Sequence, residues 1–253
     1  MRVRRLLGVV TIVVLLAIWE IVARAKANIY VPPPSQIATT FVQQWFSPAF
    51  GHDAVPSLWR LLAGYAIAAV LGVAIGIAIG VSVPLYRTLD PLLQVLRALP
   101  PTAVIPAGIL VLGIGDAMKV AVIAFGAIWP ILVNSVDGAH AVARERLDTA
   151  RNFGLGRGET ILFVIVPSAL PQVFAGLRIG LALAFIMIVI SEMVGGSNGL
   201  GYAILSAQRT FSIPEMYAGI VLLAILGFAL NALFSLVERR VLAWHVGATE
   251  AAR

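Results

Sequence analysis

Charged side chains that could do chemistry gather in one stretch of this sequence, between Gly138 and Glu159. The charged residues there are Arg144, Glu145, Arg146, Asp148, Arg151, Arg157 and Glu159, whereas the segments on either side are apolar. A short helix with a charged flank suits insertion into the groove of a partner protein. We therefore expect residues 137–171, called the docking segment below, to be where the chain meets water and a soluble partner.

Residue types that catalyse reactions or bind metals are scarce. The chain has no cysteine, and its three histidines, His52, His140 and His245, lie far apart. Its only lysines are Lys26 and Lys119, and neither belongs to a Gly-x-x-x-x-Gly-Lys-Ser/Thr loop for nucleotide phosphates. We predict no catalytic residue, no metal site and no cofactor bound by this chain.

The composition excludes a soluble globular domain. Of the 253 residues, 60% are hydrophobic and 12% are charged, and the mean hydropathy is +0.97. The net charge of +6 comes from basic residues between apolar runs rather than in one patch, which favours a topology signal over nucleic-acid binding. Because a helix of about 20 apolar residues crosses a bilayer, we predict an all-α integral membrane protein.

Apolar runs predict about six transmembrane helices. The runs cover residues 6–22, 58–83, 103–114, 118–136, 175–193 and 215–237. The third run is short and contains Pro106, so it begins earlier or is bent. In the second run Gly72, Gly76 and Gly80 recur four residues apart, which predicts close helix packing.

Residues 1–27 contain the first predicted transmembrane helix. A cleavable signal peptide has a similar pattern, but Ile21 and Val22 extend the apolar run to a spanning length, which favours a retained helix. Residues 28–56 are predicted to be an extracytoplasmic linker with a proline-rich start and an amphipathic helix that lies on the membrane or against the helical core. Residues 57–240 form the membrane core, and 241–253 form a C-terminal tail.

The positions of the basic residues predict the orientation. With the N-terminus inside, thirteen of the eighteen lysines and arginines lie on inner segments and five on outer segments. The positive-inside rule therefore places both termini and the docking segment in the cytoplasm.

The docking segment has its own helical pattern. Residues Ala139 to Phe153 contain no proline or glycine and predict one helix, Gly154-Leu155-Gly156 ends it, and a second helix begins near Gly158. An apolar face combines Ala143, Leu147 and Ala150, and a charged neighbouring face combines Arg144, Asp148 and Arg151. A solvated loop is the alternative interpretation.

The order Asp148-Thr149-Ala150, three residues, Gly154, nine residues, Val164-Ile165-Val166-Pro167 resembles the EAA loop of ABC-importer permeases. That pattern is Glu-Ala-Ala, three residues, Gly, nine residues, Ile-x-Leu-Pro, so the departures are conservative. Further stretches are similar to the nitrate, sulfonate and taurine branch, among them residues 31–34, 89–93, 97–100, 113–116, 176–178, 191–193, 199–202, 238–240 and 244–245.

The resemblance implies a type I importer transmembrane domain with a coupling helix at about Ala143 to Gly154. Two ATPase subunits would bind ATP and magnesium on the cytoplasmic face, and an extracytoplasmic solute-binding protein would deliver the substrate. A second permease subunit is expected to be identical, with a paired paralogue as the alternative. The residues implied to couple to the ATPase are Ala143, Arg144, Leu147, Asp148, Thr149, Ala150, Arg151, Gly154 and Pro167.

The same resemblance implies a small anionic solute such as a sulfonate, taurine or nitrate, with aromatic acids or vitamin precursors as the alternative. An ion-gradient-driven transporter would need ionisable residues deep within several helices, and the second, fourth and sixth apolar runs offer almost none. An intramembrane enzyme lacks its Ser/His/Asp or His-Glu-x-x-His pattern.

Three polar residues in apolar runs are candidates for the translocation pathway. Glu192, beside Ser191 near the outer end of its run, is either a pathway or gate residue, or else makes an interhelical hydrogen bond or lies in an exposed loop. Asn231 is first a candidate for an interhelical hydrogen bond and second a pathway residue. Arg178 is expected to snorkel to the interface or to pair with an acid.

Overall fold

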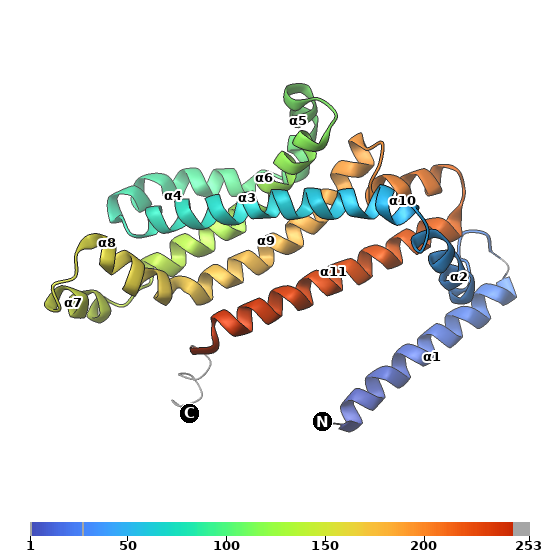
Figure 1. The fold of residues 1–253 in the computed structure, drawn as a ribbon, viewed down its shortest axis with the longest axis horizontal. Coiled ribbons are helices and arrows are strands. Elements are labelled where there is room, and N and C mark those ends of the chain that lie inside the picture. Colours follow the sequence, from blue (N-terminus) through green and yellow to red (C-terminus); the bar gives the residue numbers. More distant parts are fainter. Residues whose placement is uncertain (1, 27, 245–253) are drawn as a thin grey trace. The chain divides into compact units, whose positions relative to one another are not determined.

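The computed structural model describes residues 2–26 and 28–244, and all regular elements in those residues are helices (Figure 1). The chain divides into two compact units. The first combines Met1–Ser57 with Gly196–Leu226, and the second combines Leu58–Gly195 with Gly227–Arg253. From residue 245 onward the predicted tail lies outside the described residues.

The first unit is built around a short amphipathic helix. It contains α1 (Arg2–Lys26), α2 (Pro34–Trp45), the π-helix η1 (Phe50–Ala54), α10 (Leu200–Arg209) and the first part of α11 (Ile213–Val241). Trp45 at the end of α2 is buried in a cluster with Ala54, Leu200 and Leu222. The predicted amphipathic helix therefore packs at least one aromatic residue against its own unit.

Side chains of this unit also hold the start of α10. The Gly199 N–H donates to Asp53 Oδ1 at 3.1 Å, and the Leu200 N–H donates to Ser57 Oγ at 2.8 Å. The first amides of a helix have no partner within it, so these two side chains satisfy donors that would otherwise be unpaired.

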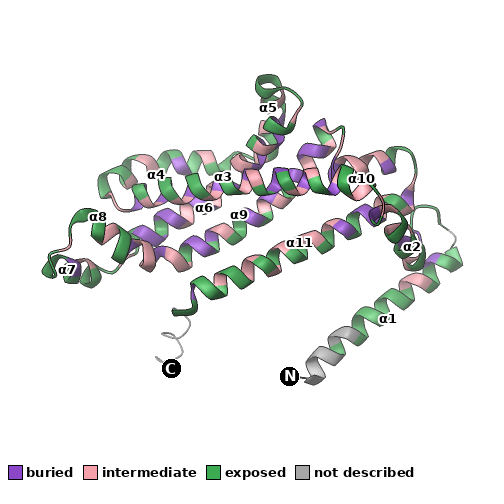
Figure 2. Cartoon of the chain, viewed as in Figure 1, coloured by how far each residue is buried: buried purple, intermediate pink, exposed green. Residues whose placement is uncertain are grey.

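The second unit holds the long central helices. It contains most of α3 (Val55–Gly80), then α4 (Val83–Ala98), the 3-10 turn η2 (Pro101–Val104), α5 (Ile105–Leu112), α6 (Asp116–His140), α7 (Arg144–Asn152), α8 (Arg157–Thr160), the π-helix η3 (Ile161–Ile165), α9 (Val166–Gly195) and the rest of α11. Figure 2 shows buried residues recurring along α6 and α9, whereas α5 and α7 are mostly exposed.

Small residues let the central helices approach one another closely. A Cβ added to Gly76 of α3 would lie 2.7 Å from the Leu132 carbonyl oxygen of α6, and one added to Gly80 would lie 2.6 Å from that of Val136. On α9, a Cβ at Gly176 would lie 2.8 Å from the Pro130 carbonyl oxygen. These close approaches confirm the prediction that the α3 glycines serve packing. Such van der Waals contact stabilises helix pairs in lipid, where the hydrophobic effect does not act between helices.

Four helical stretches are long and apolar enough to cross a membrane: Phe50–Gly80, Asp116–His140, Arg157–Gly195 and Ile213–Val241. Helices α4 and η2–α5 meet at a break with a bend of 82°, and together they can form a fifth span. The predicted third span is therefore bent, and Pro100 and Pro101 lie at the break. The predicted count of about six is reached only with α1 added, and some side chains of α1 lie outside the described residues.

Candidate functional site

The docking segment begins with a break that the sequence pattern does not predict. The expectation of a single helix from Ala139 to Phe153 is wrong at its start, because Ala139 and His140 complete α6 and the backbone of Ala143 is extended, with ψ 136°. Packing explains where α6 ends: Ala139 is buried, and the His140 ring stacks on Tyr86 with centroids 4.5 Å apart. No glycine or proline marks the break.

The end of α7 is a glycine turn, as predicted. Gly154 has φ +74°, a left-handed conformation that side chains with a Cβ rarely adopt. The Gly154 N–H donates to Arg151 O at 2.9 Å, and the Leu155 N–H donates to Ala150 O at 3.1 Å. These two bonds form a Schellman motif. Helix α8 begins one residue before the expected Gly158, and Glu159 Oε2 accepts from the Gly156 N–H at 2.8 Å.

One face of α7 is charged and open. Arg144, Leu147, Asp148 and Arg151 lie on successive turns and line a hollow of about 330 Å³. Arg151 Nη1 lies 3.2 Å from Asp148 Oδ1, and both side chains are more than half exposed. A salt bridge this exposed adds little stability to the helix, so these groups remain available to an opposing surface.

Of the three residues in the predicted apolar face of α7, only Ala150 packs against the chain itself. Ala150 is only 3% exposed, Leu147 is half-buried, and Ala143 precedes the helix and is exposed. The three residues therefore do not form one apolar helix face as expected, while the coupling role of Ala143, Leu147 and Ala150 stays a prediction. The short α7 packs Ala150 inward, and Thr149 Oγ1 donates to the Glu145 carbonyl at 2.7 Å within the helix.

A side-chain hydrogen bond links α7 to the long helix that follows. Arg146 Nη1 donates to Ser168 Oγ, in the first turn of α9, at 2.9 Å. From Arg157 to Gly195 the chain is one continuous helical stretch, and the π-helix η3 ends at Ile165, two residues before Pro167. Proline removes a helical hydrogen bond, and a wider turn next to it accommodates that loss. Pro167 therefore lies inside the continuous helical stretch from Arg157 to Gly195 and not at one of its ends.

A second hollow lies between the helical stretch from Arg157 to Gly195 and the connection from α3 to α4. It has a volume of about 700 Å³, and its walls include Leu147, Arg151 and Ile165 on one side and Val81 to Pro84 on the other. Leu147 and Arg151 line both hollows, so open space borders this part of α7.

The pathway candidates Ser191 and Glu192 lie in the last turns of α9, where both are fully buried. Glu192 Oε1 lies 2.8 Å from Arg60 Nη1 of α3, and Ser191 Oγ donates to the Ile188 carbonyl at 3.0 Å. The contact of Glu192 is an interhelical ion pair, one of the alternatives expected for it. A pathway role for either residue stays a prediction.

Sequence reasoning missed the partners of Glu192. Arg60 also lies 2.7 Å from Asp116 Oδ1, at the start of α6. Lys119, one turn further along α6, is buried and interacts electrostatically with all three residues. Arg60 and Lys119 are two of the five basic residues that the orientation count assigns to outer segments. The available signal was the cost of a charge inside an apolar run, which requires a partner.

The remaining candidates are more exposed. Asn231 is exposed on α11. The Arg178 guanidinium pairs with the Glu238 carboxylate and lies 5.8 Å from the Phe234 ring centroid, which confirms that Arg178 pairs with an acid. Within the described part of the chain, no cluster of three or more His, Cys, Asp or Glu residues could hold a metal ion.

Comparison with known families gives one match that covers most of the chain. Residues 68–243 match the model of the binding-protein-dependent transport system inner membrane component. The matched range includes the docking segment and all central helices of the second unit except the start of α3.

Several named relatives align with nearly the whole chain. The taurine transport system permease protein TauC of Escherichia coli is 30% identical, covering 94% of this chain and 90% of the relative. The nitrate import permease protein NrtB of Synechocystis is 33% identical, over 92% and 87% respectively. A protein of Bacillus subtilis named as the aliphatic sulfonates transport permease SsuC is 33% identical, over 94% and 87%.

Solved structures match the fold. The MetNI methionine ABC transporter in an inward-facing conformation aligns with a TM-score of 0.63 at 20% identity, covering 75% of this chain and 94% of that chain. An amino acid ABC transporter solved with histidines aligns with a TM-score of 0.59 at 19% identity, covering 77% and 95%. The predicted all-helical fold of a type I importer transmembrane domain is confirmed.

Proposed function

This chain belongs to the family of binding-protein-dependent transport system inner membrane components, and we propose on that premise that its docking segment couples it to a separate ATPase. The chain is the membrane permease of an ABC importer, and the family is not catalytic. Another subunit must then hydrolyse ATP. It needs a surface on this chain to bind, so that hydrolysis can move the permease.

The observation that carries the proposal is the combination of an open charged face and a firm attachment on α7. Arg144, Asp148 and Arg151 present charges outward, and the Arg146–Ser168 bond links the same helix to α9. A displacement of α7 by a bound ATPase therefore reaches α9 directly, and α9 packs closely on α6. Packed helices with two arrangements convert such displacements into opening on one side or the other.

The proposed layout follows from this role. The docking segment lies in the cytoplasm, as the distribution of basic residues predicts, with both termini on the same side. Residues 1–27 supply an N-terminal membrane helix, 28–56 an extracytoplasmic linker, 57–240 the permease core and 241–253 a cytoplasmic tail. The importer then consists of two permease subunits, expected to be identical, two ATPase subunits and an extracytoplasmic solute-binding protein.

The proposed substrate is a small anion that carries an oxyanion group. The relatives are named for taurine, nitrate and aliphatic sulfonates, and these solutes share a compact group of oxygens with a negative charge. The chain is similar to these three relatives at comparable identity. This similarity supports an anion with such an oxygen group as the substrate and does not favour one of the three solutes.

The coupling proposal is tested by reversing charge on the open face of α7. We expect Arg144→Glu combined with Arg151→Glu to lower the amount of ATPase subunit that copurifies with the permease by about tenfold, because the arginine charges proposed to pair with the partner's surface are then reversed. Arg209→Glu, an exposed arginine of α10, is the matched control and should leave recovery unchanged. Full ATPase recovery with the double variant would overturn the proposal.

A further inference from the structure

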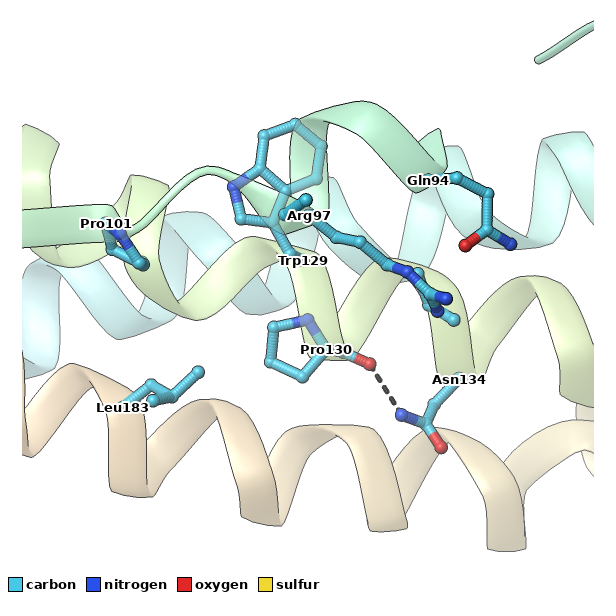
Figure 3. Close-up of a pocket in the computed structure, with 10 residues that line it drawn as sticks. Gln94, Arg97, Pro101, Trp129, Pro130, Asn134 and Leu183 are labelled. Atoms are coloured by element: carbon cyan, nitrogen blue, oxygen red, sulfur yellow. Dashed lines mark hydrogen bonds between the residues drawn. The ribbon is translucent and has the colours of Figure 1, made fainter. Parts of the chain in front are cut away.

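A cavity of about 570 Å³ opens beside α6, within the second unit. Its walls come from α4, η2, α6 and α9, and Figure 3 shows Arg97, Trp129 and Leu183 reaching it from three of these elements. The lining is mostly apolar, with Gln94, Arg97 and Asn134 as its polar members. A mostly apolar cavity with a few convergent polar groups is the common form of a small-molecule site.

The cavity lies halfway along a membrane-spanning helix. Trp129 lies thirteen residues after the start of α6 at Asp116 and eleven before its end at His140. A helix of this length measures about 37 Å, close to the thickness of a bilayer. A guanidinium beside Trp129 is therefore near the membrane midplane, where an unbalanced charge is costly.

Arg97 belongs to the last turn of α4, directly before the bend of 82°. Non-helical backbone at membrane depth is tolerated where it is buried in protein or lines a water-filled cavity. Transporters use such interrupted helices near the midplane to bind solutes. The position of Arg97 at the interruption places its charge beside space that a solute can occupy.

The arginine has no counter-ion among the described residues. Asp90 and Asp137 line a neighbouring hollow together with Arg97, but neither forms an ion pair with it. The Asp90 carboxylate instead accepts a bond from Gln94 Nε2 at 3.4 Å. The guanidinium thus keeps its donors free on the cavity side.

The Trp129 ring also lines the cavity, although its own nitrogen is not exposed to it. The Trp129 indole nitrogen is buried without a hydrogen-bond partner in the described part of the chain, and the Phe125 ring packs edge-on against the indole at 5.4 Å between centroids. Asn134 differs, because its amide nitrogen donates to the Pro130 carbonyl at 2.8 Å and its oxygen accepts from Gln172.

We propose that this cavity binds the transported anion partway across the membrane, with Arg97 holding the oxyanion and the Trp129 ring forming part of the wall. A guanidinium presents a planar fork of donors that matches sulfonate, carboxylate or nitrate oxygens. The apolar lining accommodates the short carbon chain of an organic anion. The inference rests on the proposed import of an anion and adds a binding site within the permease.

The test uses the complete importer with its binding protein, in vesicles, and labelled taurine, methanesulfonate and nitrate as probes. Arg97→Gln should lower uptake about tenfold or more, since a charged hydrogen bond is lost, while ATPase assembly stays normal. Arg97→Lys should recover part of the uptake. Arg87→Gln, an exposed arginine on the same helix, is the matched control. Unchanged uptake by Arg97→Gln would overturn the site but leave the proposed function standing.

A second readout does not depend on transport. Because the chain has no cysteine, Val133→Cys places a single thiol in the cavity wall, and a bound probe anion should slow its reaction with a thiol reagent. Adding Arg97→Gln should abolish that protection. If Val133→Cys alone reacted at the same rate with and without each of the three probes, the site would be contradicted. If the wild-type importer took up none of the three, both the proposed import of an anion and the cavity site would be overturned.

Discussion

Arg60 of α3 and Glu192 of α9 form a buried ion pair, with Nη1 and Oε1 2.8 Å apart and exposed fractions of 3% and 0%. The same guanidinium reaches Asp116 at the start of α6. Arg60 lies near the start of α3, and Glu192 lies in the last turn of α9. The pair therefore fastens three central helices at one end, the end opposite to the docking segment along α6 and α9.

Loss of Arg60 is expected to cost more stability than loss of Glu192. Arg60→Met leaves a buried carboxylate without this partner, and removing one member of a buried pair costs about 3–5 kcal/mol. After Glu192→Gln the guanidinium still has Asp116, so the cost is smaller. Thermal unfolding of the purified protein in detergent measures the order. Equal stability of the two variants would contradict the shared role of Arg60.

The exposed pair of Arg178 and Glu238 serves as a contrast. Arg178 is 49% exposed, and exposed ion pairs contribute about 1 kcal/mol or less. Arg178→Gln should therefore shift the unfolding temperature only slightly, in the same assay. A loss as large as that of Arg60→Met would mean that the pair has a role in assembly beyond its contacts within this chain.

Gly154 is expected to be required for coupling and not for insertion. Valine at φ +74° is strained by about 1–2 kcal/mol or more, so Gly154→Val should distort the end of α7. We expect normal amounts in the membrane but less solute imported per ATP hydrolysed. Gly158→Val is the control, because Gly158 has open space and no positive φ.

Gly76 is expected to be required for packing. Its added Cβ would lie 2.5 Å from Ser135 Cβ, and both helices would have to move apart. Overpacking of this kind costs about 1–3 kcal/mol. Gly76→Ala should lower thermal stability, whereas Gly51→Ala, at a position with nothing within 4 Å, should not.

The sequence predicts the features that depend on local chemistry. Gly154 follows a helical run and ends it, and the α3 glycines recur at a packing interval, so both were visible in residue type and spacing. The charges of the docking segment identified its exposed face in the same way. The prolines at 100 and 101 and Pro106 signalled that the third span is irregular.

Features that depend on packing between distant segments could not be read from the sequence. The end of α6 at His140 has no local breaker, and it follows the burial of Ala139 and the stacking on Tyr86. Arg60 and Glu192 are 132 residues apart, so only the fold pairs them. The burial of Ala150 depends on how α7 packs against the rest of its unit. Helical spacing in the sequence does not determine which side of α7 is buried.

The most direct test of the central claim is labelling of a single thiol on the docking face. Asp148→Cys gives one reactive site in a chain that has no other cysteine, and Ser197→Cys, exposed between α9 and α10, gives the control. A membrane-impermeant maleimide should label the cysteine at 148 only in inside-out vesicles, and binding of the ATPase subunits should protect it. Labelling of that cysteine from the outside, or equal labelling with and without the ATPase, would contradict the account.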